Sequence, residues 1–169
     1  MTPKTFLAAT ALGLALLSCR SVDHHGNLEQ ALDEHGRAVA PIVTKSSPHS
    51  VPKTLDRLEA ALTAKGLTVF TRIDHGAGAA KVNIPLPATQ ILIFGNPKVG
   101  TPLMVENRNV GLDLPLKAMA WEDDKGQVWL SYTAPATLAK RFDITENAAV
   151  ISKMTQALEG LTSKAIEFE

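Results

Sequence analysis

The chain has 169 residues, enough for one domain with a buried core and a short extension. Its 17 basic and 17 acidic residues balance, so net charge predicts no affinity for nucleic acid or for an acidic substrate. Aromatic residues make up only 5% of the chain, which disfavours a surface that stacks bases. We therefore expect no nucleic-acid partner.

Residues 1–18 predict a secretory signal peptide rather than part of the fold. Lys4 gives a positive start, and residues 6–17 form an apolar segment that is too short to span a bilayer as a mature helix. The segment ends at Leu16-Leu17-Ser18-Cys19, which resembles a bacterial lipobox. Cys19 is therefore the predicted lipidation site. Cleavage elsewhere, which would leave an ordinary thiol, is the alternative.

A lipid on Cys19 would attach the protein to the cell envelope on its periplasmic side. Several acyl chains on one residue are sufficient for stable membrane attachment. Arg20 follows the cysteine in place of Asp, which resembles the sorting pattern for the outer membrane of Gram-negative bacteria. Cys19 is also the only cysteine, so an internal disulfide cannot form.

Residues 19–38 are polar and predict a tether between the membrane and a single domain that covers residues 39–169. The tether contains His24, His25 and His35, which could bind a transition metal. Scattered histidines in a tether more often bind none, so we predict no metal site there. The sequence identifies no cofactor.

The domain is expected to open with a strand and a helix. Residues 39–46 have strand character, and Ser50 is a typical N-cap for the helix that follows. Gly66 is typical of the position just past a helix C-terminus. The apolar stripe of this helix consists of Val51, Leu55, Leu58 and Leu62.

Four more strands are predicted, at residues 67–73, 90–94, 116–122 and 127–132. Between them we expect a flexible turn at 74–78, a weak extended edge segment at 81–87, and a hairpin turn at 123–126. Met119, Trp121 and Trp129 alternate on their strands, which predicts packing in the core or in a dimer.

Two further helices complete the predicted domain. Thr101 and Pro102 resemble the N-cap and first residue of a short helix that ends near Asn109 and is closed by Gly111. A last helix is expected to begin near residue 143 or 145. Its buried stripe consists of Val150, Ile151, Met154, Leu158, Leu161 and Ala165. The order of elements predicts an α+β fold, an antiparallel sheet with two helices on one face.

Several spaced motifs resemble the bacterial domain-of-unknown-function family 302, over residues 47–169. They are Arg72-Ile73-Asp74-His75-Gly76-Ala77-Gly78-Ala79, Phe94-Gly95-Asn96-Pro97-Lys98-Val99-Gly100-Thr101-Pro102-Leu103-Met104, Leu112-Asp113-Leu114-Pro115-Leu116, Trp121-Glu122-Asp123 and Ser131-Tyr132. The resemblance implies a β-α-β4-α fold with a shape like TATA-box-binding domains, and a homodimer. It implies no DNA binding, because fold does not fix function. Members often have Asn-Asp-Pro where this chain has Thr133-Ala134-Pro135, and no settled activity comes with the family.

Five residues are the candidate ligand-binding residues: His75, Asn96, Lys98, Thr101 and Asp113. Backbone N–H groups at residues 101–103, with Lys98 nearby, could bind an anion or a carboxylate. The plain alternative is that Asn96 only caps a turn. A long ordered connection at residues 94–104 favours a binding role for this loop.

His75 is also the candidate for chemistry, because a neighbouring carboxylate can orient a general base or a metal ligand. Asp113 and Glu122 could complete such a cluster, although a structural histidine is the more common case. The sequence contains no Gly-x-Ser-x-Gly motif, so no serine nucleophile of that kind is predicted.

Three functions remain open from the sequence. The first is a lipid-anchored periplasmic domain that binds a small ligand or partner, with an apolar pocket bordered by His75 and Asn96. The second is an enzyme, with or without a metal, in which His75 lies within hydrogen-bond reach of a carboxylate. The third is an envelope assembly factor whose sheet edge or loop binds another protein through an exposed apolar patch.

Overall fold

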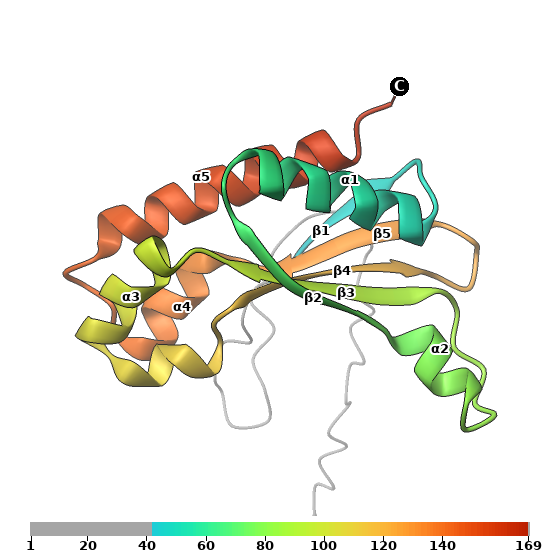
Figure 1. Ribbon diagram of the computed structural model, residues 1–169, viewed down its shortest axis with the longest axis horizontal. Coiled ribbons are helices and arrows are strands. Elements are labelled where there is room, and N and C mark those ends of the chain that lie inside the picture. Colours follow the sequence, from blue (N-terminus) through green and yellow to red (C-terminus); the bar gives the residue numbers. More distant parts are fainter. Residues whose placement is uncertain (1–41, 169) are drawn as a thin grey trace, which may run out of the picture.

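The computed structural model describes residues 42–168, and the predicted signal peptide, tether and lipidation site lie outside them (Figure 1). In this range five strands form one antiparallel sheet in the order β1-β5-β4-β3-β2, so the predicted α+β class is confirmed. The elements are β1 (Ile42–Ser47), α1 (Val51–Ala64), β2 (Thr68–Asp74), α2 (His75–Ala80), β3 (Thr89–Gly95), α3 (Pro97–Glu106), the 3-10 helix η1 (Arg108–Leu112), β4 (Leu116–Glu122), β5 (Val128–Thr133), α4 (Pro135–Phe142) and α5 (Ala148–Ala165).

The helices α1 and α5 lie side by side on one face of the sheet, as Figure 1 shows. Every residue of the predicted α1 stripe is at most 1% exposed, and each large apolar side chain buried in this way stabilises the fold by about 1.5–3 kcal/mol. Ser50 caps α1, and Gly66 follows it with φ of +74°, which glycine adopts without strain. The core between these helices and the sheet contains Leu55, Leu58, Leu92, Phe94, Leu130 and Leu158.

A second apolar cluster lies at one end of the sheet, where α3, η1, α4 and the first half of α5 meet. Its buried members are Leu103, Val110, Leu138, Phe142, Ile144, Ile151 and Met154. Leu103 is the buried residue of α3 and Val110 that of η1. This cluster packs α3 beside α5, and Leu116 contacts both this cluster and the core under α1.

The tryptophans lie on the sheet face that α1 and α5 leave uncovered. Trp121 and Trp129 are paired across β4 and β5, with ring centroids 6.3 Å apart and planes at 28°. Trp121 Nε1 donates to Ser131 Oγ at 2.9 Å, and Trp129 Nε1 donates to Asp123 Oδ2 at 2.9 Å. Both rings are half-buried, so they are not part of the core between the sheet and the helices.

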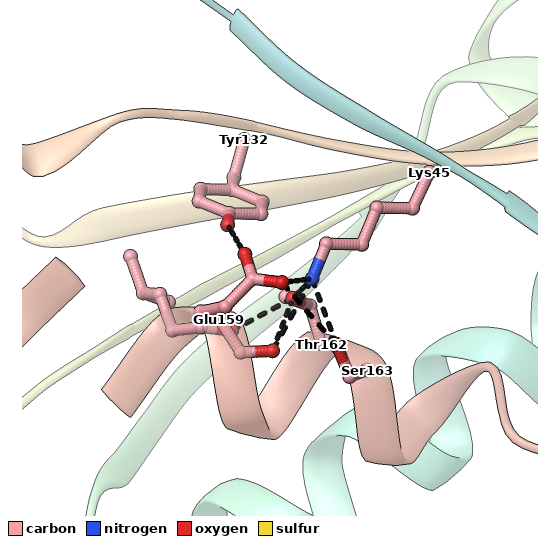
Figure 2. Close-up of polar contacts among 6 residues, drawn as sticks. Lys45, Tyr132, Glu159, Thr162 and Ser163 are labelled. Carbon is pink, nitrogen blue, oxygen red and sulfur yellow. Dashed lines mark hydrogen bonds and ion pairs between the residues drawn. The ribbon is translucent and has the colours of Figure 1, made fainter. Parts of the chain in front are cut away.

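Polar contacts fasten α5 to the edge strand β1 (Figure 2). Lys45 Nζ donates to Glu159 Oε1 at 2.8 Å, to Thr162 Oγ1 at 2.9 Å and to Ser163 Oγ at 3.0 Å. Tyr132 OH donates to the other oxygen, Glu159 Oε2, at 3.2 Å. The hydrogen bond from Lys45 is the main reason that the pKa of Glu159 is lowered. These contacts set the position of α5 over the sheet.

The predicted turn at residues 74–78 is wrong, because the chain forms the helix α2 there. Asp74 Oδ1 accepts a hydrogen bond from Ala77 N at 2.8 Å and so caps the helix, and the alanines that follow favour it. The predicted extended segment at residues 81–87 is also wrong, since these residues form no strand. Val82 and Ile84 are 64% and 61% exposed there.

The predicted start of the third helix is wrong by five residues, since Thr101 and Pro102 were the predicted N-cap and first residue. Asn96 caps α3, and its Oδ1 accepts from Lys98 N at 2.9 Å, while Pro97 occupies the first turn. Asn96-Pro97 and Thr101-Pro102 each place a capping residue before a proline. The helix begins at the first pair, because Pro is tolerated in the first turn of a helix. Pro102 therefore lies inside α3, and Gly111 lies inside η1.

The helix α4 was not predicted, and α5 begins later than expected, at Ala148. The residue before α4 is Ala134, whose side chain cannot cap a helix, so the usual start signal is missing. Asp143 ends α4 in the left-handed conformation, with φ of +50°. In residues 42–168 none of the helices is long and apolar enough to cross a membrane.

Candidate functional site

A large apolar cavity lies between α3, α5 and the adjacent ends of the sheet strands. We call it the α3–α5 groove, and its volume is about 1020 Å³. Phe94 and Leu116 from the sheet and Leu67 and Phe70 from β2 and its approach line it. Val99 and Met104 line it from α3, and Val150, Met154, Ala157 and Leu161 line it from α5.

The groove exists because α1 is shorter than α5. Figure 1 shows α5 continuing past the C-terminal end of α1 toward α3. Helix α1 ends at Ala64, and Gly66 turns the chain into β2, so no part of α1 covers the sheet beyond that point. Gly160 lines the α5 side, and the space beside it is open, since a Cβ added to it would meet no atom within 4 Å. Apolar surface of the sheet and of α5 is therefore left accessible in the groove.

Glu106 fixes the two helical walls of the groove relative to each other. It is the last residue of α3, and its carboxylate accepts hydrogen bonds from the backbone at the start of α5. Oε1 accepts from Glu146 N at 2.9 Å and also from Thr145 N, and Oε2 accepts from Asn147 Nδ2 at 2.8 Å. Desolvation raises the pKa of Glu106, but the hydrogen bonds from Asn147 and the backbone together lower it below its ordinary value.

Every charged residue among the described residues that line the groove is a lysine. These residues are Lys65 after α1, Lys98 on α3, and Lys153 and Lys164 on α5. Within residues 42–168 none of the four has a carboxylate within ion-pair distance. Lys45, by contrast, is engaged with Glu159. The groove thus combines apolar walls with an uncompensated positive rim.

Three of the five candidate ligand-binding residues lie at the groove. Asn96, Lys98 and Thr101 line it, because α3 begins directly after β3. Asp113 does not line it; its Oδ2 lies 2.9 Å from Arg141 Nη1, beside a separate cavity of about 150 Å³. His75 does not line it either, since it starts α2 at the opposite end of the sheet.

The strand register separates His75 from both carboxylates that could act with it. Asp74 is paired with Gln90, whereas Phe94 is paired with Leu116, three residues after Asp113. Gln90 and Phe94 are four residues apart, about 13 Å along β3. Glu122 is at the same end as His75, but β3 lies between β2 and β4, which are therefore about 10 Å apart.

The arrangement of His75 therefore offers no pair for general base catalysis with Asp113 or Glu122, because a hydrogen bond needs heavy atoms about 3 Å apart. Across residues 42–168 no cluster of three or more His, Cys, Asp or Glu side chains could hold a metal ion. His75 is solvent-exposed at the start of a helix whose residues are all at least partly exposed.

The sequence missed the α5 side of the groove. Met154, Leu158 and Leu161 were assigned to a buried stripe, and they are buried, but they also border the groove. The sequence pattern does not distinguish Lys153, Gly160 and Lys164, because exposed lysines and a helical glycine are common on any surface helix. A useful signal would have been the small residues Ala157 and Gly160 beside that stripe.

Comparison with known proteins identifies related sequences. A family model described as domain of unknown function DUF302 matches residues 43–161. A fluoride-specific ion channel, FluC 1 of Brucella suis biovar 1 (strain 1330), is 46% identical over 123 residues, which are 73% of this chain and 48% of that protein. FluC 1 of Brucella abortus biovar 1 (strain 9-941) is also 46% identical over 123 residues, with 73% and 46% coverage. The chain thus spans about half the length of these curated relatives.

A solved structure has the same fold. The crystal structure of an uncharacterized conserved protein DUF302 from Bacillus stearothermophilus superimposes with a TM-score of 0.67. The match covers 73% of this chain and 97% of that one, at 18% sequence identity. At that identity the likeness concerns the fold alone and says nothing about a shared ligand.

Proposed function

Because this chain belongs to the family described as domain of unknown function DUF302, which carries no named activity, we propose its function from the α3–α5 groove. The protein is a binding module that holds a small, largely apolar ligand in this groove. A lipid on Cys19 attaches it to the periplasmic side of the bacterial envelope, at the outer membrane. The single observation that carries the binding role is the cavity of about 1020 Å³ between α3 and α5.

The character of the groove favours binding over catalysis. Ligand pockets are typically concave, mostly apolar and about 300–1,000 Å³ in volume, with a few polar groups that orient the ligand. The uncharged polar side chains among the described lining residues are Asn96, Thr101 and Gln156. None of these is a usual general base, and no carboxylate among the described lining residues could assist one.

Gly160 provides the sharpest test of the binding role. The neutral probe N-phenyl-1-naphthylamine, which fluoresces in apolar surroundings, should bind the purified full chain at the groove. Gly160→Leu places a side chain into the groove without striking another atom near its Cβ, so it should abolish probe binding. Gly160→Ala is the matched control: it improves helix propensity by at most about 1 kcal/mol and leaves the groove open. Equal probe binding by both variants would refute the proposal.

The anchor rests on the N-terminal sequence. An apolar segment of signal-peptide length leads directly into Ser18-Cys19, and Arg20 is compatible with the outer membrane. Growth with globomycin should accumulate the precursor, and radiolabelled palmitate should be incorporated into the wild-type chain but not into Cys19→Ser. Unchanged processing with globomycin, together with an unlabelled wild-type chain, would contradict the anchor.

We propose that the protein forms a homodimer through the uncovered sheet face. The family resemblance implies a dimer, and the half-buried rings of Trp121 and Trp129 on this face support one. Trp121→Ala should shift the mass measured by light scattering from dimer toward monomer. Phe168→Ala, at a highly exposed residue near the C-terminus, is the control. A wild-type chain that is monomeric at high concentration would exclude the dimer.

The relatives support a second candidate function, in association with a membrane channel. These relatives are named as fluoride-specific ion channels, and the matched segment is about half of their length. The domain would then bind to or regulate a channel of this kind. Fluoride efflux from liposomes that contain a FluC channel should change when the full chain is added. An unchanged efflux rate, with no chain retained on the liposomes, would exclude this candidate.

A further inference from the structure

We propose that the ligand of the α3–α5 groove is a fatty acid, bound in its carboxylate form. Its alkyl chain lies along α5, and its carboxylate lies at the α3 end of the groove, where Lys98 begins α3 and Lys153 lies in the first half of α5. This inference rests on the proposed binding function and adds the chemical class of the ligand to it. Three features of the groove carry it: its length, the sign of its charge and its few uncharged polar groups.

The groove is elongated along α5. Lys153 and Lys164 both line it and are eleven residues apart on this helix, which corresponds to about 16 Å along the helix axis. Ala157 and Gly160 lie between them and leave room on that wall. An alkyl chain fits a long apolar channel of this kind, because burying each methylene group is worth about 0.8 kcal/mol.

The charge of the rim fixes the sign of the ligand. Lys65, Lys98, Lys153 and Lys164 all line the groove, and within residues 42–168 none has an ion-pair partner. Lysine stems can cover apolar surface while their ammonium groups reach the solvent-exposed edge. The positive end of the α3 dipole lies at the same rim, since Asn96 and Lys98 begin this helix. An anionic head group is complementary to this rim.

The scarcity of other polar groups favours a small head group. Asn96, Thr101 and Gln156 are the uncharged polar side chains among the described lining residues, and Asn96 Oδ1 already accepts from Lys98 N. A sugar head group would find only these three uncharged side chains as hydrogen-bond partners, and the quaternary ammonium of a phosphocholine head would be repelled by the lysines. A carboxylate needs only cations, which the lysines supply. We therefore assign a fatty acid rather than a lysophospholipid.

Amphiphiles with one chain length and different heads test this assignment directly. The assay measures displacement of N-phenyl-1-naphthylamine from the purified full chain, in detergent-free buffer and below each critical micelle concentration. The competitors are dodecanoate, dodecan-1-ol, dodecyltrimethylammonium and dodecyl phosphocholine. We expect dodecanoate to bind at least ten-fold more tightly than dodecan-1-ol, and the cationic amphiphile to bind most weakly. Raising the salt concentration should weaken the binding of dodecanoate and leave the binding of dodecan-1-ol unchanged.

Charge-reversed variants connect that preference to the rim. The double variant Lys98→Glu/Lys153→Glu should bind dodecanoate about ten-fold or more weakly than wild type, with dodecan-1-ol changed less than two-fold. Lys81→Glu/Lys125→Glu alters net charge equally at exposed positions away from the groove and is the matched control. It should retain wild-type affinity for dodecanoate.

The outcomes separate the ligand class from the binding function. Equal affinities for dodecanoate and dodecan-1-ol, or equal losses in the two lysine variants, would overturn the fatty-acid assignment. Tighter binding of dodecyl phosphocholine than of dodecanoate would overturn it as well. In those cases the proposed binding function would still stand if the wild-type chain bound the probe and Gly160→Leu did not. Failure of all four amphiphiles and of the probe to bind wild type would overturn both.

Discussion

The two ends of the sheet use the same local device and reach different results. At one end β2 runs into Asp74, which caps α2, and at the other β3 runs into Asn96, which caps α3. Helix α2 has no buried residue, whereas α3 buries Leu103 in an apolar cluster with α4 and α5. A capping side chain therefore starts a helix, but tertiary packing decides whether that helix builds a site.

The largest expected effect is on the buried residue of α3. Leu103→Ala removes a side chain that is 0% exposed and should lower the free energy of unfolding by about 2–5 kcal/mol. Ala79→Gly in α2 should cost about 1 kcal/mol or less, because only helix propensity is lost. Urea denaturation of both variants measures the difference. Similar losses would mean that the two ends contribute equally to stability.

The cap of α3 should matter to both stability and binding. Asn96→Ala removes the acceptor for Lys98 N and should lower the free energy of unfolding by about 1 kcal/mol. Because Asn96 and α3 line the groove, the probe affinity should fall as well. Asp74→Ala is the counterpart at the other end, and it should leave probe affinity unchanged. A loss of probe binding in Asp74→Ala would contradict the separation of the two ends.

Acid should weaken the groove through Glu106. The pKa of Glu106 is lowered in the folded protein. Its carboxylate therefore stabilises the fold at pH values above 4.5, the ordinary pKa of a glutamate. That contribution is lost as the pH falls through the lowered pKa, and the contact between the end of α3 and the start of α5 is weakened with it. Probe binding and the urea midpoint should therefore fall together below about pH 4.5.

Glu106→Gln separates this effect from general acid unfolding. The amide cannot accept all the hydrogen bonds from residues 145–147, so the variant should be less stable than wild type at pH 7. It should also lose less of its remaining stability on acidification. The pKa of Asp74 is lowered too, chiefly by the Ala77 backbone, so Asp74→Asn is the comparison at the α2 end. A steeper acid loss in Glu106→Gln than in wild type would contradict this role.

The smallest effect is expected at His75. His75→Ala changes an exposed residue far from the groove, so the free energy of unfolding should stay within about 0.5 kcal/mol of wild type. Probe affinity should also stay the same, although the sequence had placed His75 at the border of the pocket. Thermal denaturation with and without the probe measures both. A lost thermal shift would return His75 to the site.

The sequence alone determined the regular framework of this protein. Local patterns, in which the informative residues are only a few positions apart, predicted the apolar stripes of α1 and α5. They also predicted the strands β3, β4 and β5. Gly66 and Gly126 mark their turns because both have positive φ, at +74° and +79°. Such signals are local, so an isolated sequence can carry them.

The tertiary structure alone decided the candidate site. Asn96, Lys98 and Thr101 were identified as candidates, but the sequence could not bring Lys65, Lys153 and Lys164 to the same rim. Nor could it predict that Glu106 would bind residues 145–147 across about forty positions. The groove depends on where α1 ends relative to α5, which is a distance between elements rather than a pattern within one.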